Sequence, residues 1–138
     1  MNLAEILISL YSNIAVLIKK STISQKITLS QLLCINAIPF DGISQSDLSN
    51  SLNIEFSTLS RNLDKLLDKG LIKKKKSSND LRLKKIYLTD EGISLNKNII
   101  RLLQKELNQF NDQIHVEELL SVISKFNWIL FKDKHSYE

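Results

Sequence analysis

Two neighbouring stretches of this chain hold the side chains best suited to chemistry. The first, "STLSRNLDK" at 57–65, sets hydroxyl, guanidinium, amide and ammonium groups between regularly spaced leucines. The second, "KKKKSSNDLRLKK" at 73–85, is the most basic run of the sequence. Groups of these kinds contact the base edges and phosphates of a nucleic acid. Together the two stretches indicate a partner that is a polyanion.

The positive charge of the chain is concentrated around these stretches. Residues 61–85 hold ten Lys or Arg and three Asp, a net charge of +7, whereas the whole 138-residue chain has a net charge of +4. The remainder is therefore net acidic. A lysine run alone usually marks only a solvated surface. One basic segment on a near-neutral chain is typical of an electrostatic contact with nucleic acid.

A helix over 55–70 would separate an apolar face from a polar one. At about 100° per residue, one arc holds the side chains that we expect to be buried: Phe56, Leu59, Leu63, Leu66 and Leu67. The opposite arc holds those that we expect to read the major groove: Ser57, Thr58, Arg61 and Lys65, with Asn62 and Asp64 at its edges. Arg61 can bind a guanine through two hydrogen bonds, worth roughly 1–3 kcal/mol of discrimination. Many surface helices share this pattern, so its function must be inferred together with the neighbouring segments of the chain.

The preceding segment places this helix second in a helix-turn-helix. Residues 44–53 predict a short helix with Ser44 as its N-cap and Asn53 as a left-handed stop. The next helix, over 55–70, is closed by Gly70. Two short helices joined by three or four residues are the signature of this DNA-binding motif.

Two earlier segments also predict helices. Residues 3–18 carry apolar side chains at spacings of three and four, which is one apolar stripe. Residues 28–40 would form a helix that is capped by Thr28 or Ser30 and ended by Pro39.

After Gly70 the helical spacing gives way to alternation. Ile86 and Leu88 alternate with Lys85 and Tyr87, and the turn cluster "SSND" separates two candidate strands. A β-hairpin directly after a helix-turn-helix is the winged variant of that motif. In a two-stranded hairpin, the lysines at 73–76 cannot all face the same way.

Helical spacing returns in the last third of the chain. Thr89 can cap a helix at "TDEG", and apolar spacing continues to Phe110. A final helix is predicted over roughly 115–131. With only three glycines and one proline, the chain is predicted to be mainly α with a small hairpin wing.

These residues together resemble the MarR family of bacterial and archaeal transcription regulators. "STLSRNLDKLLDKGLI" at 57–72 is similar to the family sequence, and "NDLRLKKIYLTDEG" at 79–92 matches its wing pattern of Asp-x-Arg, an apolar strand and Leu-Thr-x-x-Gly. "ITLSQLLCI" at 27–35 resembles the family's Leu-Thr-x-x-Gln opening of the second helix. The order of elements extends the resemblance over essentially the whole chain.

The resemblance implies one winged helix-turn-helix domain over 1–138. Its DNA-binding lobe would cover about 28–90, with dimerisation helices over about 1–20 and 91–132. The implied protein is a homodimer that binds a pseudo-palindromic double-stranded DNA operator and regulates transcription as a repressor. The resemblance also leaves room for release by a small-molecule effector that changes the spacing of the two lobes.

Carried onto this chain, the family's wing arginine, which reaches into the minor groove, is Arg82. The aspartate that holds it in place is Asp80. The DNA backbone would be contacted by the other basic residues of the wing: Lys73, Lys74, Lys75, Lys76, Lys84 and Lys85.

The apolar residues support a dimer independently of the resemblance. Both ends of the chain are richer in Leu, Ile and Phe than a monomer of this length can readily cover, and a two-fold dimer is the commonest solution. The alternative is that these helices pack only on their own lobe. The side chains expected at the interface are Leu3, Ile6, Leu7, Leu10, Leu119, Ile123, Phe126 and Trp128.

Catalysis, metals and cofactors have little support in the sequence. No nucleophile–base pair, phosphate loop or carboxylate pair stands out, so an enzyme is not expected. His115 has only Glu117 and Glu118 near it, without a convincing ligand set. Cys34 lies among aliphatic residues and is predicted to be a buried, inert thiol rather than a redox sensor.

Two other functions fit the same fold. A winged helix can serve as a protein-interaction module, but such modules commonly lose the charged face that Arg61, Lys65 and Arg82 provide here. The same fold can also act as a transcriptional activator. The N-terminus lacks the charge order of a secretory signal, and no run of 18 apolar residues occurs, so we expect a cytoplasmic protein without a membrane span.

Overall fold

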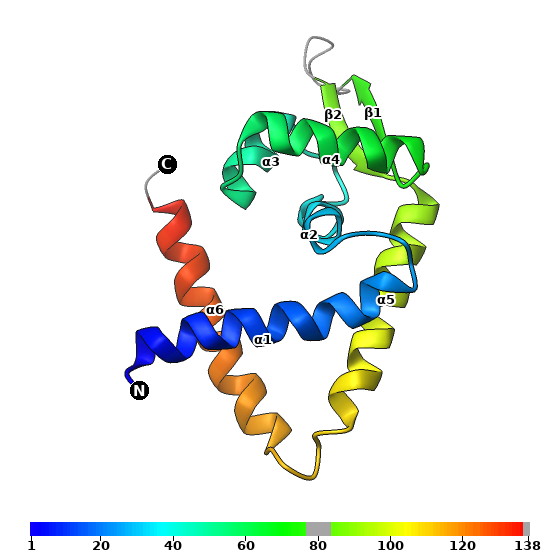
Figure 1. Cartoon of the computed structure of the whole chain (residues 1–138). Coiled ribbons are helices and arrows are strands. Elements are labelled where there is room, and N and C mark those ends of the chain that lie inside the picture. Colours follow the sequence, from blue (N-terminus) through cyan, green and yellow to red (C-terminus); the bar gives the residue numbers. More distant parts are fainter. Residues whose placement is uncertain (77–83, 137–138) are drawn as a thin grey trace. The chain divides into compact units, whose positions relative to one another are not determined.

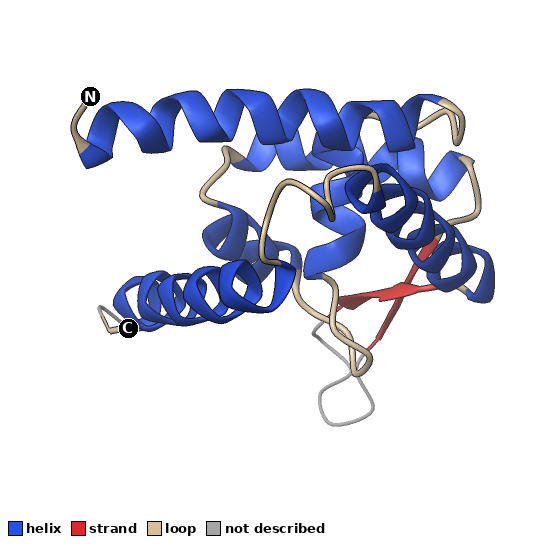
Figure 2. Ribbon diagram, turned by 90° about the horizontal axis from the view of Figure 1, so that it is seen from below, coloured by secondary structure: helices blue, strands red, loops and turns tan. Residues whose placement is uncertain are grey.

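The computed structural model describes residues 1–76 and 84–136, which form six helices and one two-stranded hairpin (Figure 1). The predicted fold class, mainly α with a small hairpin wing, is confirmed (Figure 2). The chain divides into two compact units, Met1–Leu103 and Gln104–Glu138. The first unit holds four helices, the hairpin and most of α5 (Asp90–Asn108), and the second holds the end of α5 and the last helix.

A reciprocal cap starts α1 (Leu3–Ile23). Asn2 Oδ1 accepts a hydrogen bond from Glu5 N at 3.0 Å, while Glu5 Oε2 accepts one from Asn2 N at 2.7 Å. This capping box satisfies two donors that the helix itself cannot pair. The helix continues to Ile23, past the apolar stripe over 3–18 and the predicted helix of about 1–20. Within the described part of the chain it is the one helix long and apolar enough to cross a membrane, a test that core helices and N-terminal signals also pass.

The same kind of cap starts α2 (Leu29–Ala37). Thr28 Oγ1 accepts from Gln31 N, and Gln31 Oε1 accepts from Thr28 N, both at 3.1 Å. Thr28 is therefore the cap, of the two candidates that the sequence offered. The helix ends at Ala37, and the next residue, Ile38, adopts an extended conformation because the residue before a proline is disfavoured in the helical region.

Both predicted boundaries of α3 (Gln45–Leu52) are confirmed. Ser44 Oγ accepts a hydrogen bond from Asp47 N at 3.1 Å, as an N-cap does. Asn53 adopts the left-handed conformation, with φ of 50°, which asparagine tolerates better than most residues.

The turn that follows leads directly into α4 (Phe56–Asp68). Ser49 Oγ donates to Ile54 O at 2.7 Å and so fixes the path of the chain between the paired helices. Past the other end of α4, Gly70 has φ of 69°, a conformation that glycine adopts at no steric cost. The helix-turn-helix predicted from the sequence is therefore present.

The hairpin consists of β1 (Ile72–Lys76) and β2 (Lys84–Leu88), which are antiparallel. On its other edge, β2 also pairs with Ile43. Ile43 N donates to Ile86 O at 3.0 Å, and Ile86 N donates to Ile43 O at 2.8 Å. Because Ile86 is also buried, these contacts attach the wing to the body of the first unit.

Aliphatic side chains from α2 to α5 and from both strands form the core of the first unit. Replacing such a side chain by alanine typically costs about 2–5 kcal/mol, so this core holds α4 and the wing in one body. Its buried members include Leu32, Cys34, Ile35, Leu48, Leu59, Leu63, Leu66, Ile72, Ile86 and Ile99.

The start of α5 lies against the end of α4 through Thr89. Its Oγ1 accepts from Gly92 N at 3.1 Å and donates to Gly70 O at 2.6 Å. Thr89 N donates to Leu71 O at 3.1 Å. Gly92 lies so close to the backbone of Leu71, the residue before β1, that a Cβ built on it would be 2.0 Å from Leu71 O.

The second unit is mainly α6 (Val116–His135), which is longer than the predicted 115–131. Within the described residues, none of this helix's side chains is buried. Glu117 and Glu118 lie in its first turn, and Lys132 and Lys134 lie in its last, where each sign of charge is favoured by the helix dipole.

Gly92→Ala is expected to lower the free energy of unfolding by about 3 kcal/mol, because the added methyl group must displace the Leu71 backbone. Gly70→Ala is the matched control. Its new methyl group would meet nothing within 4 Å, so only the left-handed backbone penalty of about 1–2 kcal/mol applies. Urea unfolding of both variants measures the difference. Equal losses would show that the close approach at Gly92 is not a constraint.

Candidate nucleic-acid interface

Three side chains predicted to read DNA lie on the solvent-facing side of α4. Ser57, Arg61 and Lys65 are exposed, opposite the fully buried Leu59, Leu63 and Leu66. They follow one another at intervals of four residues, so they form a line along one side of the helix. This line offers a hydroxyl, a guanidinium and an ammonium group to a partner, and the structure brings these predicted residues together.

Two acidic side chains share the exposed side of α4. Asp64 and Asp68 are both exposed, and both follow Arg61 along the helix. A carboxylate repels DNA phosphates, although it can accept a hydrogen bond from a cytosine amino group. The combination favours a contact through the first turns of α4, the part of a recognition helix that meets the bases.

Two other predicted DNA-reading residues lie on the flank of α4 that faces α2. Thr58 and Asn62 are half-buried, and Asn62 Nδ2 donates to Ser30 Oγ at 2.8 Å. On the other flank, Gln45 Nε2 donates to Ser60 Oγ at 2.7 Å. The sequence analysis did not single out these partners. The feature of the sequence that could have indicated such a contact is the position of Asn62 near the border between the two faces of α4.

The prediction that Phe56 belongs to the buried face of α4 is wrong. Phe56 is 53% exposed, whereas Leu59, one turn later, is fully buried. Phe56 is the first residue of the helix, and the core closes only over the following turns. The helical wheel assumes equal burial along the helix, so it cannot detect this end effect.

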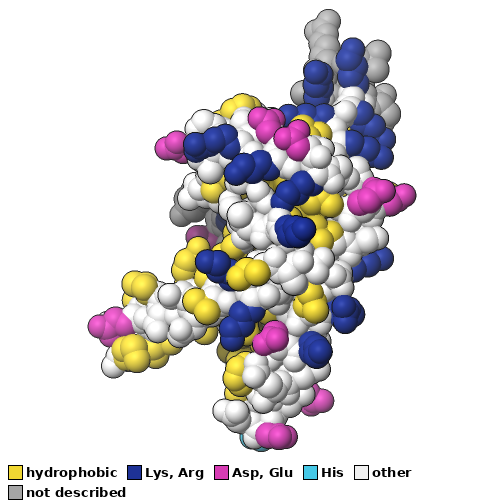
Figure 3. Space-filling view, turned by 45° about the vertical axis from the view of Figure 1, so that its right-hand side comes forward, with side chains coloured by type: hydrophobic (Ala, Val, Ile, Leu, Met, Phe, Trp, Pro, Cys, Tyr) yellow, Lys and Arg dark blue, Asp and Glu magenta, His cyan; other side chains and the backbone are white. Residues whose placement is uncertain are grey.

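The register of the hairpin divides the wing lysines between its two faces. Lys73 pairs with Tyr87 and Lys75 with Lys85, whereas Lys74 pairs with Ile86 and Lys76 with Lys84. Because cross-strand partners share a face and faces alternate along a strand, each face carries three lysines. Lys73 to Lys76 and Lys84 are exposed, and Lys85 is half-buried. Figure 3 shows Lys and Arg side chains gathered around the hairpin.

One wing lysine also contacts an aromatic ring. Lys75 Nζ lies 4.5 Å from the centroid of the Tyr87 ring, within the range of a cation–π interaction. Tyr87 in turn packs against the turn at Gly42, where a Cβ would lie 2.6 Å from the ring. This packing orders the base of the wing. Asp80 and Arg82 lie outside the described residues, so their pairing stays a prediction.

The residues expected at a dimer interface are mostly exposed in the single chain. Leu7 is half-buried and the other seven are exposed, from 38% for Phe126 to 68% for Leu3. Aromatic rings gather on α6, where the rings of Trp128 and Phe131 stack with centroids 5.6 Å apart. Exposed apolar side chains that gather on one surface are typical of a contact with a partner.

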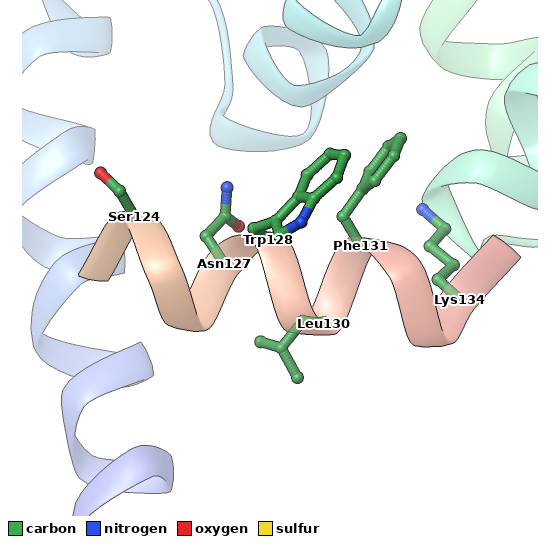
Figure 4. A pocket seen from close by; sticks show the side chains of 6 residues that line it. All are labelled: Ser124, Asn127, Trp128, Leu130, Phe131 and Lys134. Carbon is green, nitrogen blue, oxygen red and sulfur yellow. The ribbon is translucent and has the colours of Figure 1, made fainter. Parts of the chain in front are cut away.

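Cavities lie along these apolar helices. One, of about 640 Å³, is lined by α1 and the start of α2, including Val16, Ile23, Ile27 and Ser30. Another, of about 510 Å³, follows α6, where Trp128, Phe131 and Lys134 point to the same side of the helix (Figure 4). The first cavity is more apolar and lies within the first unit.

Cys34 is fully buried in the core, as predicted. Burial raises the pKa of its thiol from the ordinary 9.0 to about 11. Because the thiolate is the reactive form, this environment makes the thiol unreactive. Across the described residues, no group of three His, Cys, Asp or Glu is placed to hold a metal ion.

The chain is similar to known proteins over the segment that contains these residues. The model of the MarR family matches residues 27–84, the segment from α2 to the wing. The "Uncharacterized HTH-type transcriptional regulator YdgJ" of Bacillus subtilis (strain 168) is 32% identical over 84 residues, which are 61% of this chain. The chain spans about half of that relative's length, 46%.

Solved structures have the same fold as the chain. Wild-type MarR from E. coli in its apo form has a TM-score of 0.78 at 20% identity, covering 94% of this chain and 98% of MarR. A mutant MarR complexed with operator DNA has a TM-score of 0.73 at 20% identity, covering 93% of each chain. CouR from Rhodococcus jostii RHA1, bound to p-coumaroyl-CoA, has a TM-score of 0.77 at 15% identity, covering 98% of this chain and 94% of CouR.

The burial of Cys34 predicts slow chemical modification. At about pH 8, iodoacetamide should alkylate the native thiol at least about a hundredfold more slowly than the unfolded chain, since the raised pKa lowers the thiolate fraction by that factor.

The raised pKa of Cys34 also predicts that the free energy of unfolding falls as pH rises from about 9 towards 11, where only the unfolded thiol ionises. The Cys34→Ser variant is the control for the pH series. In the alkylation experiment, equal rates in the native and unfolded chains would contradict the burial of the Cys34 thiol.

Proposed function

We propose that this chain, whose residues 27–84 match the model of the MarR family, is a member of that family that binds a specific double-stranded DNA sequence and represses transcription as a homodimer. The observation that carries the proposal is the line of Ser57, Arg61 and Lys65 on the exposed side of α4. In a helix-turn-helix protein, this second helix enters the major groove. The complex of a mutant MarR with operator DNA, which shares the fold, supports that use of it.

The side chains divide the work of recognition. Arg61 would read a guanine, and Ser57 would contact bases or phosphates near the start of α4. Lysines on both faces of the wing hairpin would bind phosphates on either side of the groove that the wing enters. Arg82, held by Asp80, would reach into the minor groove, as the family resemblance implies.

The apolar faces of α1 and α6 support the homodimer. Each face is exposed in the single chain, and a two-fold pairing would remove both from water. Two recognition helices related by a two-fold axis would read half-sites centred about 10 base pairs apart. A dimer bound across a promoter would repress transcription by blocking RNA polymerase. The protein would act in the cytoplasm.

A small-molecule effector would act through the apolar cavity between α1 and α2. Its volume of about 640 Å³ lies in the range of small-molecule sites, and CouR, which shares the fold, is bound to p-coumaroyl-CoA. An occupant of this cavity would change the spacing of the two DNA-binding lobes and so release the operator.

Selection from a pool of random DNA duplexes, followed by gel-shift titration, tests DNA binding. The expected result is a pseudo-palindromic site with the half-site spacing given above. The logarithm of affinity should fall steeply with the logarithm of salt concentration, at about 0.9 per phosphate contacted. Failure to enrich any duplex would reject the proposal in favour of a protein-interaction module. Reporter expression in a strain that lacks the protein distinguishes a repressor from an activator.

Arg61→Ala should relax discrimination at one base position in each half-site by about 1–3 kcal/mol, because a bidentate contact to guanine is lost. Arg101→Ala is a matched control, since Arg101 is an exposed arginine on α5 and should leave the affinity unchanged. Titration of duplexes with single-base changes measures the effect. Uniform weakening across all of these duplexes would instead identify Arg61 as a phosphate contact.

Ile123→Lys should convert the dimer into a monomer, because it places a charge on the apolar face of α6. Ile123 is 48% exposed in the single chain, so the chain itself should still fold. Lys125→Ala, on the same helix, is the control and should remain dimeric. Sedimentation equilibrium measures the mass. An unchanged dimer in the Ile123 variant would exclude this face of α6 from the interface.

A further inference from the structure

We infer that Asn62 is a positioning residue: its hydrogen bond to Ser30 fixes the rotation of α4, and it does not read a base. This bond, the Ser30–Asn62 clamp, joins residues 32 positions apart in the chain. The inference rests on the proposed DNA-binding function, which makes the rotation of α4 important.

The direction of the Asn62 side chain is the first observation. Arg61 lies on the exposed side of α4, and Asn62 follows about 100° further around the helix. There it is half-buried against α2, with its Nδ2 2.8 Å from Ser30 Oγ. The side chain therefore points along the flank of the first unit, away from the line of Ser57, Arg61 and Lys65.

The chemistry of base reading is the second observation. An asparagine discriminates adenine by donating from Nδ2 to N7 and accepting at Oδ1 from N6, so both amide atoms must face the groove. In this chain Nδ2 is directed at Ser30. Turning the amide towards a base would break the clamp and leave the Ser30 hydroxyl without this partner.

A second hydrogen bond holds the opposite flank of α4. Gln45 Nε2, at the first residue of α3, donates to Ser60 Oγ at 2.7 Å. Between the two flanks, α4 is held by buried leucines, whose apolar contacts have little directional preference. Hydrogen bonds weaken steeply with angle, so one on each side of the helix limits its roll about its own axis.

The roll of α4 decides where Arg61 meets the DNA. A helix free to roll must lose that freedom on binding, which lowers the affinity. Removing the clamp should therefore weaken binding to every duplex by a similar factor. Loss of a base contact would instead change the preference at one base pair.

A double-mutant cycle tests the clamp on the sequence selected by the wild type. Ser30→Ala and Asn62→Ala should each weaken binding roughly fivefold, as expected for one lost hydrogen bond. The double variant should be no weaker than either single variant, and base preferences should stay as in the wild type. Ser30→Thr, which keeps the hydroxyl, should restore wild-type affinity.

Two outcomes would overturn the inference. One is a base preference that Asn62→Ala relaxes and Ser30→Ala leaves intact, which would make Asn62 a base reader. The other is unchanged affinity in both alanine variants, which would show that the bond does not position α4. In either case the wild type still binds its site, so the proposed function would stand. If the wild type selects no site, the proposed function fails instead, and the clamp as a DNA-positioning device fails with it.

A measurement without DNA checks the bond itself. In NMR spectra, the side-chain amide resonances of Asn62 should shift in Ser30→Ala and stay near their wild-type positions in Ser30→Thr. Gln45→Ala, which affects only the opposite flank, is the control and should leave those resonances in place. Resonances of Asn62 that are insensitive to Ser30→Ala would also overturn the inference.

Discussion

The burial of one leucine face of α4 fixes both the core of the first unit and the orientation of its candidate DNA-binding surface. Leu59, Leu63 and Leu66 are completely removed from water, so this side of the helix is committed to the core. The opposite side must then face solvent, and it carries Ser57, Arg61 and Lys65. The same burial that stabilises the fold therefore places the candidate DNA-reading groups on the surface.

The same core also holds the base of the wing in place. Ile72 and Ile86 are buried at the base of the hairpin, and Ile43 pairs with the outer edge of β2. With the base held, the strand period of two sends successive lysines to opposite faces. The run Lys73 to Lys76, which looks uniform in the sequence, divides into two pairs on opposite faces, and Lys84 and Lys85 bring each face to three lysines. This arrangement suits a hairpin with phosphates on both sides.

The polar contacts around α4 link its surface to other parts of the first unit. Ser30 binds Asn62 and also lines the cavity between α1 and α2. The Ser30 hydroxyl thus contacts the recognition helix, and the same residue lines the cavity. Among the described residues, the apolar side chains of α1 and α6 are largely exposed to solvent, which is the physical reason for expecting a second copy.

The local features could be predicted from the order of residues, because caps, turns and periodicity depend on neighbouring residues. Ser44, Asn53 and the alternation in β2 were sufficient to place the helix-turn-helix and the wing. How far each face is buried depends instead on packing between segments that are distant in the chain. Phe56 is exposed because the core does not reach the first turn of α4. Asn62 is directed at Ser30 because α2, distant in sequence, packs beside it, and no helical wheel contains that contact.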